Sequence, residues 1–299
     1  KRQGGMGVVY RAEDTRLKRT VALKFLSPFA MESEDERKRF KHEARAAATL
    51  NHPHICTVHE ISEVDDQTFI VMTYQPGSTL KHRIEQGPLS IDEVIDITIQ
   101  LADGLQEAHN HEIIHRDVKP ANVMINDKGQ VTITDFGLAK LAGVSKITKT
   151  STTLGTVSYM SPEQAQGEAA DKRSDVWSLG VVLFEMLTGR VPFQGDYELG
   201  VVYSILNDKA PRAQDIRPEI PAELQHHLDK ALAKDPDSRF QNAGEWLAEL
   251  IALRNERSVS KSIPLDPPSL KKFVTRPRFF IPAFLLFATL GTLIALPYM

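Results

Sequence analysis

The chain has 299 residues, which is longer than a typical single domain and leads us to expect two lobes or two domains. Its hydrophobic fraction of 41% and charged fraction of 25% are those of an ordinary globular protein, and its net charge of -3 argues against a general nucleic-acid binder. A single cysteine, Cys56, excludes an internal disulfide and favours a reducing compartment. The chain begins at Lys1 and not at a methionine, so we expect a fragment or a processed chain.

The first part of the chain is predicted to be rich in strands. Residues 3–10, QGGMGVVY, contain a glycine-dense turn followed by an apolar segment. Gly4, Gly5 and Gly7 let the backbone approach a bound anion closely and offer N–H donors to it, although many hairpins also carry glycines. The next apolar segment, VALKF, predicts a mostly buried strand that contains Lys24. A lysine in such a strand is costly unless it is paired.

Residues 34–50 are expected to form a helix that opens with a capping box of Ser33 and Glu36. Its apolar or small side chains share one face: Phe40, Ala44, Ala47 and Ala48. Glu43 lies in the middle of this helix and, taken by itself, is most simply explained as a solvated surface charge.

Four residues of metal-binding types follow this helix: His52, His54, Cys56 and His59. Their alternating spacing fits no tetrahedral zinc pattern, and the chain has no second cysteine. We therefore interpret this segment as a structural turn and not as a metal site.

The second part of the chain is predicted to be helical. A short buried strand at 69–72 ends in a hinge at 73–77, which contains Pro76 and Gly77. Beyond Ser78 the apolar residues between Ile91 and Ala108 repeat at helical spacing. Ser90 and Glu93 are predicted to form a second capping box at the start of that helix.

Three more helices are expected towards the end of this part. Residues 175–188 are apolar nearly all round and are followed by Gly189, which predicts a helix buried on all sides with a glycine C-cap. Amphipathic helices are predicted near residues 223–234 and 243–254.

The segment from His115 to Gly137, HRDVKPANVMINDKGQVTITDFG, contains the main candidate site. Residues 123–125 and 131–133 predict two short strands joined by the turn at 126–129. Such a hairpin would bring Asn122 and Asp135 close together, and their oxygen atoms suit Mg²⁺. Asp117 would lie nearby, free to accept a proton from a hydroxyl.

This segment resembles the protein kinases. His115-Arg116-Asp117 with Asn122 matches the catalytic loop of the family, and Asp135-Phe136-Gly137 matches its metal-binding motif. The resemblance covers roughly residues 1–254 and implies a two-lobed α+β fold. Its small lobe would contain residues 1–72, its hinge residues 73–77, and its helical large lobe residues 78–254.

The resemblance also implies the roles of individual residues. Asp117 would be the catalytic base, and Lys119 would neutralise the transferred phosphoryl group. Asn122 and Asp135 would hold Mg²⁺. Residues of the small lobe and the hinge would bind ATP: Gly4, Gly5, Gly7, Val9, Ala22, Lys24, Met72 and Tyr74. Glu43 would be the ion-pair partner of Lys24.

Further motifs resemble those of serine/threonine kinases, in particular of bacterial membrane-anchored ones. Lys119-Pro120 and Thr156 point to serine and threonine substrates, and Arg239 resembles the partner of Glu163 in the Ser161-Pro162-Glu163 motif. Asp175 would anchor the backbone of the catalytic loop. The segment between Asp135 and Glu163 is rich in hydroxyl residues, and we hypothesise that it is autophosphorylated at one or more of Thr148, Thr150, Ser151, Thr152 and Thr153. Arg116 would bind the phosphate, and a dimer would allow this reaction in trans.

Residues 279–299 contain no charged residue and are long enough to cross a membrane as one helix. Basic residues precede them: Lys271, Lys272, Arg276 and Arg278. The positive-inside rule then places the large domain in the cytoplasm. Residues 255–278, with four prolines, are predicted to be an irregular juxtamembrane linker.

One departure from the family and two alternative functions remain. Arg2 occupies the first glycine position of the family's loop, and the strand before that loop is expected to be missing. A pseudokinase scaffold is disfavoured because no catalytic residue is lost. A small-molecule phosphotransferase is disfavoured by the Ser161-Pro162-Glu163 motif and the long threonine-rich segment.

Overall fold

A computed structural model of the chain describes residues 2–4, 7–26, 44–64, 67–136 and 157–262. The chain divides into two compact units, Lys1–Asn255 and Glu256–Met299. All the strands among the described residues belong to the first unit, and the described residues of the second are the end of one helix.

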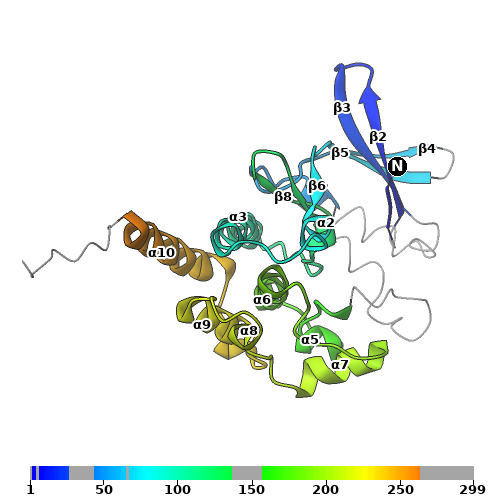
Figure 1. The fold of residues 1–299 in the computed structure, drawn as a ribbon. Coiled ribbons are helices and arrows are strands. Elements are labelled where there is room, and N and C mark those ends of the chain that lie inside the picture. Colours follow the sequence, from blue (N-terminus) through cyan, green and yellow to red (C-terminus); the bar gives the residue numbers. More distant parts are fainter. Residues whose placement is uncertain (1, 5–6, 27–43, 65–66, 137–156, 263–299) are drawn as a thin grey trace, which may run out of the picture. The chain divides into compact units, whose positions relative to one another are not determined.

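The N-terminal part of the first unit is a five-stranded antiparallel sheet (Figure 1). Its order is β1–β2–β3–β5–β4, with strands Arg2–Gly4, Gly7–Asp14, Arg19–Leu26, Val58–Val64 and Gln67–Thr73 for β1 to β5. Strand β1 is formed by the first positions of the glycine loop itself and pairs with β2 from Arg2↔Val9 to Gly4↔Gly7, so the missing strand before that loop stays a prediction.

The register of this sheet places the predicted nucleotide-binding side chains on one face. Val9 pairs with Lys24, and Ala22 pairs with Met72. Directly paired residues of antiparallel strands point to the same face, as do residues two apart on one strand. The four side chains therefore share a face, and the buried Ala22 and Met72 contribute to its small apolar core.

Of the helix predicted at 34–50, the structure describes only the end. Ala44 and Ala47 are buried, whereas Ala48 is exposed. The predicted apolar face is therefore narrower than expected, because the chain leaves the helix in a turn at Ala48 and Thr49. Glu43 and the predicted capping box lie outside the described residues.

The C-terminal part of the first unit is mainly helical, with α2 (Leu80–Ile84), α3 (Ile91–Asn110), α5 (Pro162–Ala165), α6 (Lys172–Thr188), α7 (Glu198–Asn207), α8 (Ala213–Ile216), α9 (Ala222–Ala231) and the start of α10 (Ala243–Ser262), which continues into the second unit. A small antiparallel sheet, β6–β7–β8, lies beside α2 and α3 and has strands Ser78–Thr79, Val123–Ile125 and Val131–Ile133. The predicted strands and turn of the β7–β8 hairpin are confirmed.

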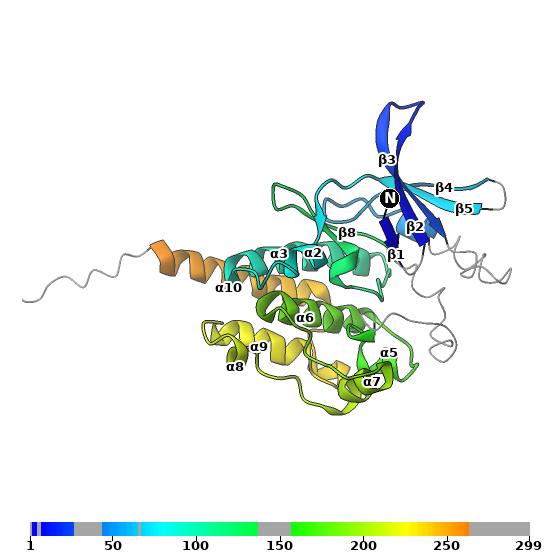
Figure 2. The ribbon, with the colours of Figure 1, turned by 45° about the vertical axis from the view of Figure 1, so that its right-hand side comes forward.

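Helix α6 is the centre of the large core and packs against α3, α8 and α9 (Figure 2). Trp177 and Phe184 are fully buried, and burial of a large apolar side chain stabilises the fold by about 1.5–3 kcal/mol. Asp171 caps its first turn, accepting a hydrogen bond from the Arg173 N–H. The predicted C-cap is confirmed, since Gly189 is left-handed at φ 75° and its N–H donates to the Glu185 carbonyl.

The start of α3 differs from the prediction in one detail. Ser90 caps the helix, and its hydroxyl accepts a hydrogen bond from the Glu93 N–H. The Glu93 carboxylate does not complete the capping box, because it accepts a hydrogen bond from the guanidinium of Arg83 at 3.1 Å. A charged partner is preferred to a backbone N–H.

The last helix is longer than predicted. Helix α10 continues to Ser262, so residues 255–262 are helical and not part of an irregular linker. No glycine or proline occurs in the helix after Gly244, and the first proline beyond it is Pro264. Among the described helices, none is both long and apolar enough to span a membrane. The predicted span at 279–299 lies outside the described residues, as does most of the predicted linker.

Candidate active site

The β7–β8 hairpin positions two of the predicted metal ligands. Asn122 ends the short 3₁₀ helix Pro120–Asn122, directly before β7, and Asp135 follows β8 after one residue. The two ends are joined by Thr134, whose N–H and hydroxyl donate to the Asn122 carbonyl at 2.8 and 3.0 Å. The hairpin therefore brings the two segments together, as the sequence predicts.

The carboxylate of Asp117 is held by two side chains that follow it closely in the sequence. Its Oδ2 lies 2.7 Å from the Lys119 ammonium and accepts a hydrogen bond from Asn122 Nδ2 at 2.9 Å. The same Nδ2 also donates to the Asp117 carbonyl at 2.9 Å. Asp117, Lys119 and Asn122 therefore form one compact group, in which the carboxylate is oriented from two sides.

Lys24 pairs with Asp135 across the site. Its Nζ lies 2.7 Å from Asp135 Oδ1, and the lysine side chain is only 4% exposed. Burial alone would raise the pKa of Asp135, but the Lys24 charge and hydrogen bond hold this pKa below its usual value. Lys24 is thus paired, as the cost of burying a lysine requires. The predicted partner Glu43 lies outside the described residues, so that ion pair stays a prediction.

The backbone that carries Asp117 is anchored to the core by Asp175 of α6. The carboxylate of Asp175 accepts hydrogen bonds from the N–H groups of His115 and Arg116, both at 2.8 Å. This carboxylate is fully buried, which would raise its pKa, but contacts with His109 and His115 keep the pKa below its usual value. The predicted anchoring role of Asp175 therefore has a geometric basis.

His109 is a participant that the sequence reasoning missed. Its Nε2 lies 2.9 Å from Asp175 Oδ2, deep in the core. The signal was present, because His109 lies on the buried stripe of α3 that contains Leu101, Leu105 and Ala108. A histidine in an apolar stripe requires a polar partner.

His115 ties the catalytic loop to the strand that precedes Asp135. Its Nε2 donates to the Thr134 carbonyl at 2.9 Å, its Nδ1 accepts from the Asp117 N–H at 3.2 Å, and its ring lies 4.6 Å from that of Phe136. Two other residues at the site have left-handed backbones, Arg116 at φ 65° and Asp135 at φ 66°. Such conformations are costly for residues with side chains and persist only where surrounding contacts impose them.

The nucleotide-binding residues predicted from the resemblance are placed on or beside the N-terminal sheet. Val9, Ala22, Lys24 and Met72 share one face, as described above. Tyr74 follows β5, and the guanidinium of Arg11 lies 5.0 Å from the centre of its ring. Gly4 and Gly7 are paired across the β1–β2 hairpin, whereas Gly5 lies outside the described residues.

An apolar pocket lies beside Met72 and Asp135. Its other lining residues are Ala44, Ala47, Ile55, Cys56, Val58, Ile70 and Phe136. Burial and the nearby Asp135 charge raise the pKa of the Cys56 thiol to about 12, so the thiol is protonated at neutral pH.

The donor atoms at the site fit Mg²⁺ better than a transition metal. Among the described residues, no three or more histidine, cysteine, aspartate or glutamate side chains form a metal cluster. Asn122 Nδ2 is used by Asp117, which leaves the carbonyl oxygen of its side chain for a cation. One amide oxygen and the Asp135 carboxylate suit Mg²⁺, which keeps waters and phosphate oxygens as its other ligands.

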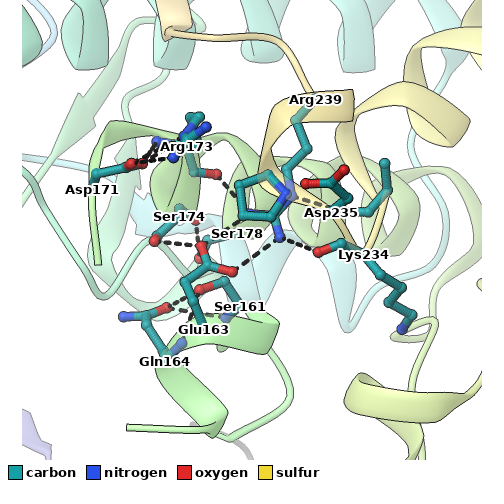
Figure 3. A network of polar contacts seen from close by, with 12 residues as sticks. Ser161, Glu163, Gln164, Asp171, Arg173, Ser174, Ser178, Lys234, Asp235 and Arg239 are labelled. Carbon is teal, nitrogen blue, oxygen red and sulfur yellow. Dashed lines mark hydrogen bonds and ion pairs between the residues drawn. The ribbon is translucent and has the colours of Figure 1, made fainter. Parts of the chain in front are cut away.

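The Ser161-Pro162-Glu163 motif takes part in a buried ion pair away from the catalytic group. The guanidinium of Arg239 binds the Glu163 carboxylate through two contacts of 3.0 Å, and Ser174 donates to the same carboxylate at 2.6 Å (Figure 3). Burial would raise the pKa of Glu163, but the hydrogen bonds from Arg239 and Ser174 keep it below its usual value. The predicted Glu163–Arg239 pair is confirmed. Thr156 and most of the segment between Asp135 and Glu163 lie outside the described residues.

Comparisons with known proteins give the similarity of most of the chain. Residues 3–249 match the protein kinase domain family. The chain is 38% identical to the serine/threonine-protein kinase PrkC of Bacillus subtilis, over 88% of this chain and 43% of that protein. It is 43% identical to the serine/threonine-protein kinase PknB of Mycolicibacterium smegmatis, over 83% of this chain and 41% of that protein. The crystal structure of the Mycobacterium tuberculosis PknI kinase domain is similar with a TM-score of 0.68 and 28% identity, covering 84% of this chain and 92% of that one. The chain thus spans less than half the length of these two curated relatives.

Proposed function

Because this chain belongs to the protein kinase family, we propose that it transfers the γ-phosphoryl group of ATP to serine and threonine hydroxyls of a protein substrate. The observation that carries this proposal is the compact group of Asp117, Lys119 and Asn122, with the Lys24–Asp135 pair at the same site. A pseudokinase would have lost a catalytic residue. All five of these positions carry the residue type that the family's motifs require.

In this proposal Asp117 orients the substrate hydroxyl and accepts its proton. Phosphoryl transfer depends on positioning and on charge stabilisation more than on covalent chemistry. The Lys119 ammonium, which lies 2.7 Å from Asp117, would stabilise charge on the phosphoryl group as it moves towards that hydroxyl. Asn122 restrains the carboxylate through its Nδ2.

The nucleotide would lie against the face of the sheet that carries Val9, Ala22, Lys24 and Met72, with Tyr74 in the hinge. Lys24 would contact the phosphates and Glu43 would hold Lys24, while Gly4, Gly5 and Gly7 would supply backbone donors. Asn122 and Asp135 would hold Mg²⁺, which neutralises charge on the phosphates when it is bound.

The substitution Asp117→Asn tests this function directly. Asparagine keeps an oxygen for the Asn122 hydrogen bond but cannot accept the proton, so we expect kcat to fall by roughly 100- to 10,000-fold. The affinity for ATP, measured by titration calorimetry, should change little. The matched control is Asp127→Asn, the same substitution at an exposed position of the β7–β8 turn, which should retain full activity. Near-normal turnover by the Asp117 variant would refute the role of this carboxylate.

Activation is proposed to proceed by autophosphorylation of the hydroxyl-rich segment before Glu163. The candidates are Thr148, Thr150, Ser151, Thr152 and Thr153, with Arg116 as the phosphate partner and a dimer as the means of reaction in trans. Mass spectrometry after incubation with ATP and Mg²⁺ should locate the phosphates. Their absence, together with full activity of a variant with alanine at all five positions, would contradict this mechanism.

The protein is further proposed to act at the cytoplasmic face of a cell membrane through a single span at residues 279–299. The support is the length and lack of charge of that segment and the basic residues before it. The full chain should sediment with membranes and be released by detergent but not by high salt, whereas a chain ending at Ser262 should stay in the supernatant. Release of the full chain by salt alone would contradict a span.

A further inference from the structure

The side chain of Gln164 connects two segments that lie far apart in the sequence. Its Nε2 donates to the carbonyl of Arg116 in the catalytic loop at 3.0 Å. Its Oε1 accepts hydrogen bonds from the N–H and the hydroxyl of Ser161, at 3.0 and 3.1 Å, so that the two residues form the capping box of α5 (Figure 3). Gln164 is buried, with 9% of its surface exposed.

The two ends of this amide are not interchangeable. The N–H of Ser161 can only donate a hydrogen bond, and the carbonyl of Arg116 can only accept one. A side chain that serves both must therefore present an acceptor to Ser161 and a donor to Arg116. Glutamine satisfies both requirements, whereas an ionised glutamate, which is equally suited to a capping box, has no donor.

The contact with Arg116 falls on a strained peptide. Arg116 has a left-handed backbone at φ 65°, directly before Asp117. Its N–H donates to Asp175 at 2.8 Å, and its carbonyl accepts from Gln164. The strained residue is therefore held on both sides. The N–H of the same peptide, that of Asp117, donates to His115 Nδ1 at 3.2 Å, so the loss of the Gln164 contact weakens the hold on the peptide before Asp117.

The two residues that hold Arg116 belong to helices that are themselves tied together. Gln164 of α5 follows Glu163, and Asp175 of α6 follows Ser174. Ser174 donates to Glu163 at 2.6 Å, and Arg239 binds Glu163 with both arms of its guanidinium. A closed ring of contacts thus runs from Arg116 through Gln164, Glu163, Ser174 and Asp175 back to Arg116.

We infer that Gln164 is a positioning residue for phosphoryl transfer: it locks Arg116 in the left-handed conformation and thereby places the carboxylate of Asp117. This inference rests on the proposed kinase function. It also couples the catalytic loop to Ser161–Gln164, the residues that end the hydroxyl-rich segment proposed to be phosphorylated.

The variant Gln164→Glu tests the inference by its pH dependence. When the new carboxylate is ionised it still caps α5 through Ser161, but it places a second acceptor against the Arg116 carbonyl. We expect kcat at pH 8 to fall roughly 10- to 100-fold, with the KM for ATP unchanged, because a displaced catalytic group loses rate and not nucleotide binding. Burial raises the pKa of such a carboxyl group, and the protonated form can donate to Arg116. The activity of the variant relative to wild type should therefore recover as the pH is lowered towards 5.5.

The matched control is Gln166→Glu, the same substitution at an exposed residue two positions later, which should match wild type at every pH. A second variant, Gln164→Met, keeps the size of the side chain but has no donor, so its kcat should be low with no recovery at acidic pH. Thermal unfolding of each variant at each pH gives the folded fraction to which kcat is normalised.

A third readout does not need activity. Amide hydrogen exchange at Arg116 should be faster in Gln164→Met than in wild type, and exchange in the core of α6 should be unchanged. Wild-type activity at all pH values in Gln164→Glu, a loss that does not depend on pH, or unchanged exchange at Arg116 would each overturn the inference. If wild type transfers no phosphate, the proposed function fails, and the exchange measurement still decides whether Gln164 holds the loop.

Discussion

The ammonium of Lys24 lies 2.7 Å from the carboxylate of Asp135, 111 positions later in the chain. Lys24 comes from the centre of β3 and Asp135 from the end of the β7–β8 hairpin, so the pair joins the two sheets at the site. The lysine side chain is 4% exposed and the aspartate side chain 22% exposed. Each residue therefore neutralises the charge of the other in a setting where neither is fully solvated.

Lys24→Met should destabilise the fold by an amount that depends on pH. Without the lysine, the Asp135 carboxylate stays largely buried and loses its ion-pair partner. We expect this to cost about 2–3 kcal/mol of the free energy of unfolding at pH 7. The value is near the lower limit for breaking a buried ion pair because part of Asp135 is exposed. In wild type the Asp135 pKa lies below its usual value, whereas burial without Lys24 would raise it above that value. The penalty should therefore shrink as the pH falls from 7 to 5 and the carboxyl group takes up a proton.

Urea unfolding at both pH values measures this difference. Lys209→Met, which removes an exposed lysine, is the control and should change the free energy of unfolding by less than about 0.5 kcal/mol. A Lys24 penalty of the same size at pH 7 and pH 5 would contradict the pairing.

Glu163→Gln should leave the buried guanidinium of Arg239 without its counter-ion. The Arg239 side chain is 0% exposed and binds Glu163 through two contacts, so we expect a loss of about 3–5 kcal/mol at pH 7. The pKa of Glu163 is lower in the folded protein than its ordinary value of 4.5. The ion pair therefore contributes its full stability at pH values above 4.5. It loses that contribution as the pH falls through the pKa of the folded state. The free energy of unfolding should therefore differ most between wild type and the variant at pH 7, and the difference should be smaller below pH 4.5.

The control is Glu168→Gln, the same substitution at an exposed position five residues later. It should alter the free energy of unfolding by less than about 0.5 kcal/mol. An effect of Glu163→Gln that is equally small, or that grows as the pH is lowered, would mean that the charge of Glu163 does not stabilise the fold.

The parts of the fold that the sequence predicts well are those in which local pattern and burial agree. Residues 175–188 are apolar on all sides and end at a glycine, and they form the buried part of α6. The strands β7 and β8 have the predicted limits because their branched side chains flank a turn with a glycine. Asp117, Lys119 and Asn122 lie within six positions of each other, so their grouping is a local property as well.

The features that the sequence does not predict depend on partners far along the chain. Glu93 binds Arg83 and not the helix N-terminus, and this choice depends on how α2 lies beside α3. The buried stripe of α3 shows only that His109 needs a polar partner, and the capping-box spacing of Ser161 and Gln164 shows only a helix start. The partners Asp175 and the Arg116 carbonyl come within reach only in the fold. Family resemblance placed Lys24 at the site, whereas its contact with Asp135 required the structure.

Gly77→Ala should be the most costly glycine substitution in the hinge region, because two effects coincide there. Gly77 has φ +104°, a conformation that costs a residue with a side chain roughly 1–3 kcal/mol. A Cβ at this position would also lie 2.0 Å from the Ile125 carbonyl oxygen and 2.8 Å from the Asn126 Cα. Both atoms belong to the backbone, so the hinge and the end of β7 would have to separate, which adds about 1–3 kcal/mol of overpacking.

Gly87→Ala separates these two effects. Gly87 has φ +126°, but a Cβ there would meet nothing within 4 Å, so this variant pays the conformational cost without the collision. In urea unfolding, Gly77→Ala should therefore lose about 1–3 kcal/mol more than Gly87→Ala. Its KM for ATP should also rise, because Gly77 is three residues from Tyr74 and lies against Ile125 and Asn126 at the end of β7, the strand that Asn122 precedes. Equal losses in the two variants would show that the hinge can move away from β7 without cost, and that its close approach does not hold the site in place.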